Sequence, residues 1–176
     1  MSLRRRNSNR LQGYDYSMPG AYFVTLVSKD WKPIFGRLAG EVVVLNEVGK
    51  IARDEWVITA KMRKEVRLDQ FTLMPNHLHA ILFTDELGSG HQELQREVVG
   101  AHGRAPLQRK ARTLASLIAA YKATTTRRIR EITANFDLKV WQRNYYDRVI
   151  RDQIELDQTR EYILYNPLKL PSVFLK

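Results

Sequence analysis

Cysteine is absent from all 176 residues of this chain. Disulfide bonds, thiolate nucleophiles and zinc sites built on cysteine are therefore excluded. No apolar run approaches the length of about 20 residues that a membrane-spanning helix needs. The opening MSLRRRNSNR has no apolar segment behind it, so we expect no signal peptide, no membrane partner and a cytoplasmic protein.

Acidic residues are scarce relative to basic ones. The chain has 29 Lys and Arg against 19 Asp and Glu, which gives a formal net charge of +10. Residues 1–100 carry 14 basic against 12 acidic residues, whereas residues 101–176 carry 15 against 7. A balance of this kind is typical of proteins that bind a polyanion, most often nucleic acid, although a merely basic surface is the alternative.

A hydrophobic content of 44% is enough for one domain with a core. We expect a basic N-terminal arm over 1–20, a single domain over 21–170 with an irregular loop at 85–112, and a tail over 171–176. Alternating and 3.6-residue apolar patterns predict the elements in between. Strands are expected at 21–27, 66–74, 78–83 and 145–150, a hairpin at 34–45, and helices at 46–61, 113–132 and 156–165.

This order of elements predicts an α+β fold. We expect a mainly antiparallel sheet of the ferredoxin-like or RNA-recognition type, with the helices on one face.

Two of the four histidines, His77 and His79, lie two residues apart where the strand predicted at 78–83 begins. Alternate strand residues point to the same face, so both imidazoles can approach one ion while Leu78 points into the core. Two ordinary polar side chains on an exposed strand are the alternative, because two ligands do not complete a metal site. His91 and His102 lie in the irregular loop, where we expect surface roles.

Tyr162 and Asn166 are four residues apart and therefore share one face of the last predicted helix. A phenol is a weak nucleophile by itself, but a divalent cation that polarises a phosphate lowers the barrier to its attack. Asn166 is a candidate oxygen ligand, and a set of two imidazoles, an amide oxygen and water suits Mg²⁺ or Mn²⁺. The alternative is that Tyr162 is packed and Asn166 only ends the helix before Pro167.

Other aromatic and basic residues are weaker candidates. Tyr145 and Tyr146 are rival nucleophiles, but adjacent strand residues face opposite ways, so one of the two is expected in the core. The tryptophans, at 31, 56 and 141, are expected in the core. Phosphate contacts are predicted for three cations of the arm and three of the helix at 113–132: Arg4, Arg5, Arg6, Lys122, Arg127 and Arg128. For the three on the helix, a solvated face is an equally good explanation.

Four segments of the chain resemble the REP-associated tyrosine transposases, a domesticated branch of the HUH one-tyrosine single-strand transposases. Met74-Pro75-Asn76-His77-Leu78-His79 is similar to their HUH motif. The other three segments follow the family's order: Gly13–Tyr16 with Gly20–Thr25, Trp141–Asp147, and Glu161–Ile163 with Asn166–Lys169. The resemblance covers about residues 10 to 170.

The resemblance implies His77 and His79 as metal ligands, Asn166 as a further amide ligand and Tyr162 as the nucleophile. It also implies a substrate that is single-stranded or hairpin DNA, often a repetitive palindrome. The reaction it implies forms a 5′-phosphotyrosine link and frees a 3′-hydroxyl, which can later rejoin strands without an energy source. Within this branch we favour a monomer over a homodimer.

Arg148 departs from the family pattern, because relatives often carry a histidine at this point. A phosphate contact by Arg148 is our hypothesis. Two other functions stay open on the sequence alone. One is a single-stranded nucleic-acid-binding module without catalysis, and the other is a metal hydrolase that uses activated water and forms no covalent adduct.

Overall fold

The computed structural model describes residues 19–85 and 113–166. The predicted arm, the irregular loop and the tail, with Arg4, Arg5, Arg6, His91 and His102, lie outside the described residues. The described elements, in chain order, are β1 (Gly20–Val27), η1 (Lys29–Trp31), β2 (Gly36–Ala39), β3 (Val42–Leu45), α1 (Glu47–Lys61), β4 (Val66–Leu73), β5 (His77–Thr84), α2 (Leu114–Thr133), β6 (Tyr146–Ile150) and α3 (Gln153–Tyr165). No helix within these two ranges is long and apolar enough to cross a membrane.

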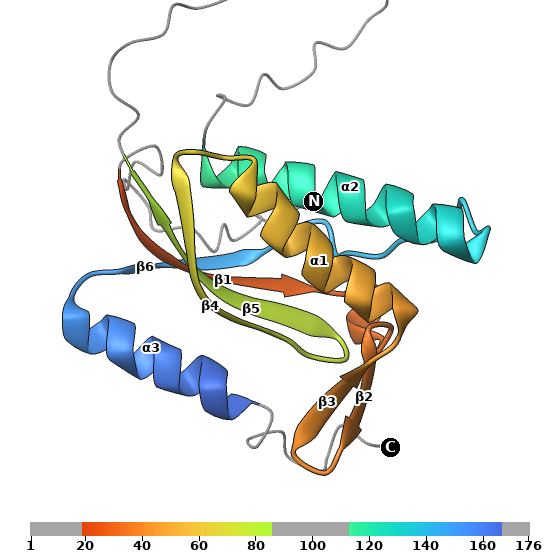
Figure 1. The fold of residues 1–176 in the computed structure, drawn as a ribbon, viewed down its shortest axis with the longest axis horizontal. Coiled ribbons are helices and arrows are strands. Elements are labelled where there is room, and N and C mark those ends of the chain that lie inside the picture. The colour runs from red at the N-terminus through yellow and green to blue at the C-terminus, as the bar shows by residue number, and fades with distance from the viewer. Residues whose placement is uncertain (1–18, 86–112, 167–176) are drawn as a thin grey trace, which may run out of the picture.

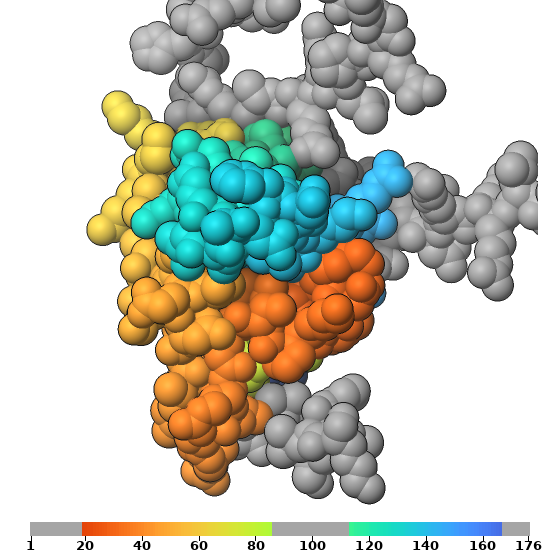
Figure 2. Space-filling model, turned by 90° about the vertical axis from the view of Figure 1, so that its right-hand side faces the viewer, coloured from red at the N-terminus to blue at the C-terminus, as the bar shows by residue number. Residues whose placement is uncertain are grey.

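Four strands form one antiparallel sheet in the order β4-β5-β1-β6 (Figure 1). The two apolar strands β1 and β5 lie in the centre, and β6 is an edge strand. The β2–β3 hairpin forms a separate sheet and projects from the body of the molecule, as both Figure 1 and Figure 2 show. Gly40 begins its turn with φ +62°, a left-handed conformation that glycine adopts without steric cost.

Helices α1 and α2 cover one face of the sheet, and α3 covers the other (Figure 1). The larger core lies under α1 and α2, where even-numbered residues of β1 and β5 such as Val24 and Leu78 are fully buried. A smaller core lies under α3, and its buried members are Ile81, Ile150, Leu156 and Ile163.

The predicted fold class is confirmed, but the placement of all helices on one face is wrong. The odd-numbered residues of β5 include Ile81, and those of β1 include Phe23, so the second face is apolar over part of its area. Apolar surface left in water is unfavourable, and α3 removes it by packing Leu156 and Ile163 there.

Side-chain caps set where the helices begin. Asn46 caps α1 as predicted, and Thr113 caps α2. In α3 the predicted start at residue 156 is late by three residues. Asp152 accepts a hydrogen bond from the Glu155 backbone nitrogen at 2.7 Å, while Glu155 accepts one from the backbone nitrogen of Arg151, so the helix begins at Gln153.

Candidate active site

The connection between β4 and β5 places the two histidines. It consists of Met74, Pro75 and Asn76, and two of its carbonyl groups are held from outside the hairpin: Phe35 donates its backbone N–H to Pro75 and Ser28 donates to Asn76. The strand β5 therefore begins at His77 in a fixed position. His79 follows on the same face, and Leu78 is fully buried in the larger core, as predicted.

The rings of His77 and His79 lie next to one another on this face of β5, with their centroids 4.5 Å apart. Both side chains are buried. Burial lowers the pKa of His77 to about 4, and burial together with repulsion from His77 lowers the pKa of His79 to about 3. Both imidazoles are therefore neutral near pH 7, which is the form that binds a metal ion.

Asn76 fixes the tautomer of His77. The Asn76 amide nitrogen donates to the backbone carbonyl of Trp31 at 3.3 Å, which turns the amide oxygen toward His77. His77 Nδ1 lies 2.7 Å from that oxygen and must donate to it, because a carbonyl oxygen only accepts. The lone pair of His77 is consequently on Nε2.

Thr25 plays the corresponding part for His79. Thr25 on β1 lies directly across from His79 in the sheet, and its hydroxyl oxygen is 2.8 Å from His79 Nδ1. When Nδ1 donates to Thr25, the lone pair of His79 is on Nε2. Ligating histidines in proteins are commonly held in this way through their second nitrogen.

Tyr162 completes the site from the opposite layer. Helix α3 brings its hydroxyl to 3.4 Å from His79 Nε2, and its ring centroid lies 5.3 Å from that of His79. Phe23 packs edge-on against Tyr162 at 6.0 Å and stacks on His79 at 5.2 Å, so one aromatic side chain orients both. Three segments far apart in sequence thus converge on one point.

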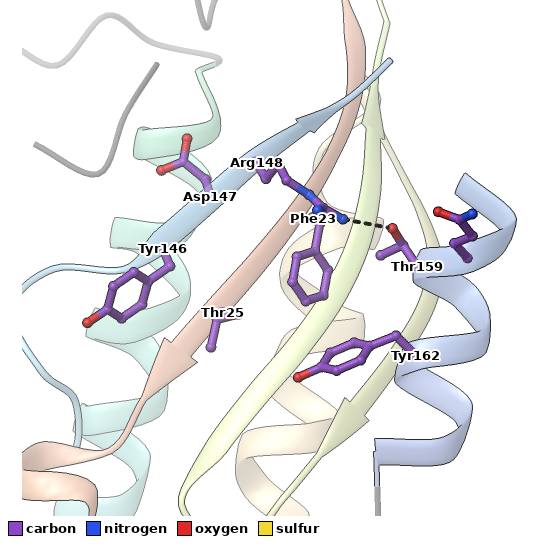
Figure 3. Close-up of a pocket in the computed structure, with 8 residues that line it drawn as sticks. Phe23, Thr25, Tyr146, Asp147, Arg148, Thr159 and Tyr162 are labelled. Carbon is purple, nitrogen blue, oxygen red and sulfur yellow. Dashed lines mark hydrogen bonds between the residues drawn. The ribbon is translucent and has the colours of Figure 1, made fainter. Parts of the chain in front are cut away.

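A cavity of about 390 Å³ opens beside Tyr162 between α3 and the β1–β6 edge of the sheet. Figure 3 shows Tyr162 pointing toward the sheet and Arg148 reaching from β6 to Thr159. The Arg148 guanidinium donates to the Thr159 hydroxyl at 3.2 Å and pairs with Glu155 at 3.3 Å, while its side chain stays 59% exposed. A cation held in place with a free outer surface is suited to contact a phosphate.

The donor set for a metal is two imidazole nitrogens and oxygens. Within the described ranges no group of three His, Cys, Asp or Glu residues could hold a metal ion. Any further ligand from the described chain would therefore be an amide, hydroxyl or carbonyl oxygen. Asn166 is the C-cap of α3 and is 6% exposed, as the alternative interpretation expected, and its side chain makes no hydrogen bond to any described residue. Its role as a ligand stays a prediction.

No protein-family model matches the chain. The chain is 34% identical over 166 residues to an uncharacterized protein of Haemophilus influenzae (strain Rd), and the match covers 94% of this chain and 90% of that protein. The chain belongs to the same family as that protein. Among solved structures, it resembles the REP-associated tyrosine transposase bound to a REP hairpin, with a TM-score of 0.55 and 17% identity over 96% of this chain and 74% of the transposase. The chain therefore has the fold of this transposase.

The other predicted DNA contacts among the described residues, Lys122, Arg127 and Arg128, lie on α2. Lys122 donates to the backbone carbonyls of Gln142 and Asn144, both at 2.9 Å, and its burial lowers its pKa to about 8. Arg128 forms an ion pair with Glu55, a buried residue of α1. The structure therefore gives Lys122 and Arg128 contacts within the fold, outside the Tyr162 cavity.

The two adjacent tyrosines divide as predicted. Tyr145 is partly buried against the larger core. Tyr146 is 47% exposed and lines the Tyr162 cavity, where Figure 3 shows it on β6. Tyr146 has no contact with a histidine among the described residues, whereas Tyr162 contacts His79.

Sequence reasoning missed three residues at the site. Thr25 and Asn76 orient the imidazoles, and only the sheet register reveals the first of them. Trp31 was expected in the core, but it is 51% exposed with its ring centroid 6.4 Å from that of His77, whereas Trp56 and Trp141 are buried as predicted. Trp31 and Asp30 both have left-handed φ angles near +58°, an uncommon and strained conformation for such residues.

Proposed function

We propose that this chain is a metal-dependent single-strand DNA nuclease and strand transferase of the HUH tyrosine type. It nicks and rejoins single-stranded or hairpin DNA through a 5′-phosphotyrosine intermediate. The observation that carries the proposal is the position of the Tyr162 hydroxyl, which lies 3.4 Å from His79 Nε2. The ring centroid of His77 lies 4.5 Å from that of His79. A structural histidine pair would not need a half-exposed phenol from another layer beside it.

The histidine pair fits a divalent cation. Both imidazoles are neutral and both Nδ1 atoms are engaged, so with Nδ1 as the donor each Nε2 carries the lone pair that binds a cation, and the Tyr162 hydroxyl lies beside that of His79. His77 and His79 would hold Mg²⁺ or Mn²⁺, with Asn166 as the proposed amide ligand. When bound there, the cation would supply charge stabilisation to the phosphate that is attacked.

The reaction itself exchanges one ester for another. The Tyr162 oxygen attacks the scissile phosphorus and loses its proton, the bond from phosphorus to the 3′-oxygen breaks, and the 3′-oxygen takes up a proton. The products are a DNA 5′-phosphate esterified to Tyr162 and a free 3′-hydroxyl. Because the number of phosphate ester bonds is unchanged, the reverse attack by a 3′-hydroxyl rejoins strands without an external energy source.

Residues around Tyr162 support this step. Phe23 restricts the phenol ring, and Thr25 and Asn76 keep the imidazoles in one tautomer. Arg148, fixed by Thr159 and Glu155, would bind a phosphate next to the one that is attacked. The solved transposase of the same fold is bound to a REP hairpin, which makes hairpin DNA the first substrate to test.

The deciding experiment is a search for a covalent adduct. Labelled single-stranded hairpin DNA is incubated with protein and Mg²⁺ or Mn²⁺, and the mixture is run on a denaturing protein gel. We expect a labelled protein band that is lost in Tyr162→Phe and in the His77→Ala/His79→Ala double variant. Tyr165→Phe is the matched control, because this exposed tyrosine lies on the same helix.

Two other outcomes would contradict the proposal. Cleavage without a band that survives in Tyr162→Phe would indicate a hydrolase that uses activated water. Binding to a broad hairpin library with neither a band nor cleavage would indicate a nucleic-acid-binding module.

A further inference from the structure

A second cavity lies on the far side of the sheet edge from Tyr162. It has a volume of about 620 Å³ and is formed by the C-terminal half of α2 and the segment that leads into β6. We call it the α2 groove and define it by its basic residues, which are Lys122, Arg127, Arg130, Lys139 and Arg143. Figure 2 shows the end of α2 and the segment that follows it side by side on one surface of the molecule.

Two of these five cations build the wall of the groove. Lys122 donates to the carbonyls of Gln142 and Asn144, and Arg130 donates to the carbonyl of Leu138 at 3.0 Å. These bonds tie the following segment to α2, so the groove is a built feature of the fold. Its shape does not depend on a ligand.

The other three cations are available to a ligand. Arg127, Lys139 and Arg143 are exposed, and none forms a salt bridge with a described residue. Among the described residues that line the groove, the single carboxylate is that of Glu131. The groove is therefore strongly positive, which favours a ligand with several negative charges along its length.

The groove also carries an exposed aromatic ring. Ala134 ends α2 in a left-handed conformation with φ +50°, and the chain then turns back along the helix. Phe136 follows this turn and is 70% exposed on the groove. A ring that is left in water beside phosphate-binding cations is the arrangement on which unpaired bases stack.

A short stretch of chain, residues 143–146, leads from the α2 groove to the edge strand β6, which borders the Tyr162 cavity. Arg143 lines the groove, while Tyr146 and Arg148 line the cavity. Tyr146 comes three residues after Arg143, a span of roughly 11 Å at most. Cations and half-exposed rings thus follow one another from the groove around the sheet edge to the nucleophile.

We propose that the α2 groove binds single-stranded DNA, and that this strand is continuous with the one in the Tyr162 cavity. The binding itself is independent of catalysis, whereas the continuity rests on the proposed function. A single strand is favoured over a duplex because Phe136 and Tyr146 offer faces for stacking, and paired bases do not present their faces. The phosphates of a duplex could contact the cations, but its bases would not stack on Phe136 or Tyr146.

The first test measures binding without catalysis. Full-length protein carrying Tyr162→Phe is titrated in a chelator with a labelled 20-nucleotide oligo(dT) and with a blunt duplex. Lys139→Ala/Arg143→Ala is expected to weaken oligo(dT) binding about tenfold and to reduce the salt dependence by about 1.4, which is two phosphate contacts on a single strand. Phe136→Ala is expected to weaken it about tenfold with little change in salt dependence.

A matched control removes two exposed lysines elsewhere. Lys61→Ala/Lys64→Ala at the end of α1 deletes the same charge outside the groove and should change binding less than twofold. Equal losses for the control and the groove variant would overturn the proposal, because the effect would then be one of net charge. A loss for the blunt duplex as large as for oligo(dT), with Phe136→Ala silent, would overturn the assignment of a single strand.

The second test concerns continuity. A photoreactive base is placed at successive positions along the hairpin substrate, and its crosslink in the Tyr162→Phe protein is mapped by peptide sequencing. We expect crosslinks to Tyr146 and then to Phe136 as the base moves away from the scissile phosphate. Crosslinks to Phe136 that do not depend on this position would overturn the continuity. If wild-type protein forms no covalent adduct, the proposed function is overturned. The binding results in chelator would still test the α2 groove, because they do not depend on catalysis.

Discussion

Thr25→Val isolates the part that one hydroxyl plays in holding the proposed metal ligand. Valine has nearly the shape of threonine and a high strand propensity, so the variant removes the 2.8 Å contact with His79 Nδ1 and little else. His79 is buried, and a buried donor that loses its partner costs roughly 1–3 kcal/mol. Outer partners of ligating histidines typically contribute about 10- to 100-fold in metal affinity.

We therefore expect Thr25→Val to bind Mn²⁺ about 10- to 100-fold more weakly than wild type. Calorimetric titration with Mn²⁺ measures this directly. Formation of the covalent adduct should fall at limiting Mn²⁺ and recover at saturating Mn²⁺, because Tyr162 itself is untouched. The free energy of unfolding in chelator should fall by roughly 1–3 kcal/mol.

Thr72→Val is the matched control. Thr72 is the other cross-strand neighbour of His79, on β4, and its side chain makes no hydrogen bond to a described residue. The same chemical change there should leave Mn²⁺ affinity within about twofold of wild type. If Thr25→Val keeps wild-type affinity, or if both variants lose it equally, the orienting role of Thr25 is refuted.

Three further predictions address the surroundings of the site. Arg148→Ala should slow adduct formation and weaken hairpin binding by about 10- to 150-fold, given roughly 1.5–3 kcal/mol for a charge-assisted phosphate contact, while Arg37→Ala on the β2–β3 hairpin should change neither. In chelator, the free energy of unfolding measured with urea should fall by on the order of 3 kcal/mol between pH 7 and pH 5. In the unfolded chain His77 and His79 take up protons with a pKa of about 6.5, whereas in the folded chain their pKa values are about 4 and about 3. This loss should be absent from the His77→Ala/His79→Ala variant. Trp31→Ala should weaken oligonucleotide binding about fivefold or more without lowering Mn²⁺ affinity, and unchanged oligonucleotide binding would show that the exposed indole does not stack on a base.

The layout of the sheet was open to prediction from the sequence because its strands carry strong local signals. The apolar, β-branched run of β1 and the Pro75-Asn76 interruption between β4 and β5 marked the strands, and the two-residue spacing predicted that both histidines share one face. The structure adds that their strand lies in the centre of the sheet. The side of the sheet that α3 covers was predicted wrongly. It depends on which apolar residues remain uncovered after α1 and α2 have packed, and that is a property of the whole fold.

The sequence predicted those site residues that spacing along one strand or one helix brings together. Tyr162 and the histidine pair could be named, but their approach to 3.4 Å depends on how α3 packs on the sheet. Thr25 gave no signal, because it lies 54 residues from His79 and meets it only through strand register. The strain at Trp31 was equally invisible, since no sequence rule places a tryptophan in the left-handed region.

The two halves of the site are held by cores of very different size. The strand β5, which carries both histidines, is anchored by its other face in the larger core, so the histidines keep their places until the whole domain unfolds. Helix α3, which carries Tyr162, rests on the smaller cluster of four buried residues and a few partly buried ones. Local opening needs less free energy where fewer apolar contacts are lost, so α3 should detach before the sheet melts. On warming, the protein would then pass through a state that keeps its affinity for Mn²⁺ but has lost its nucleophile.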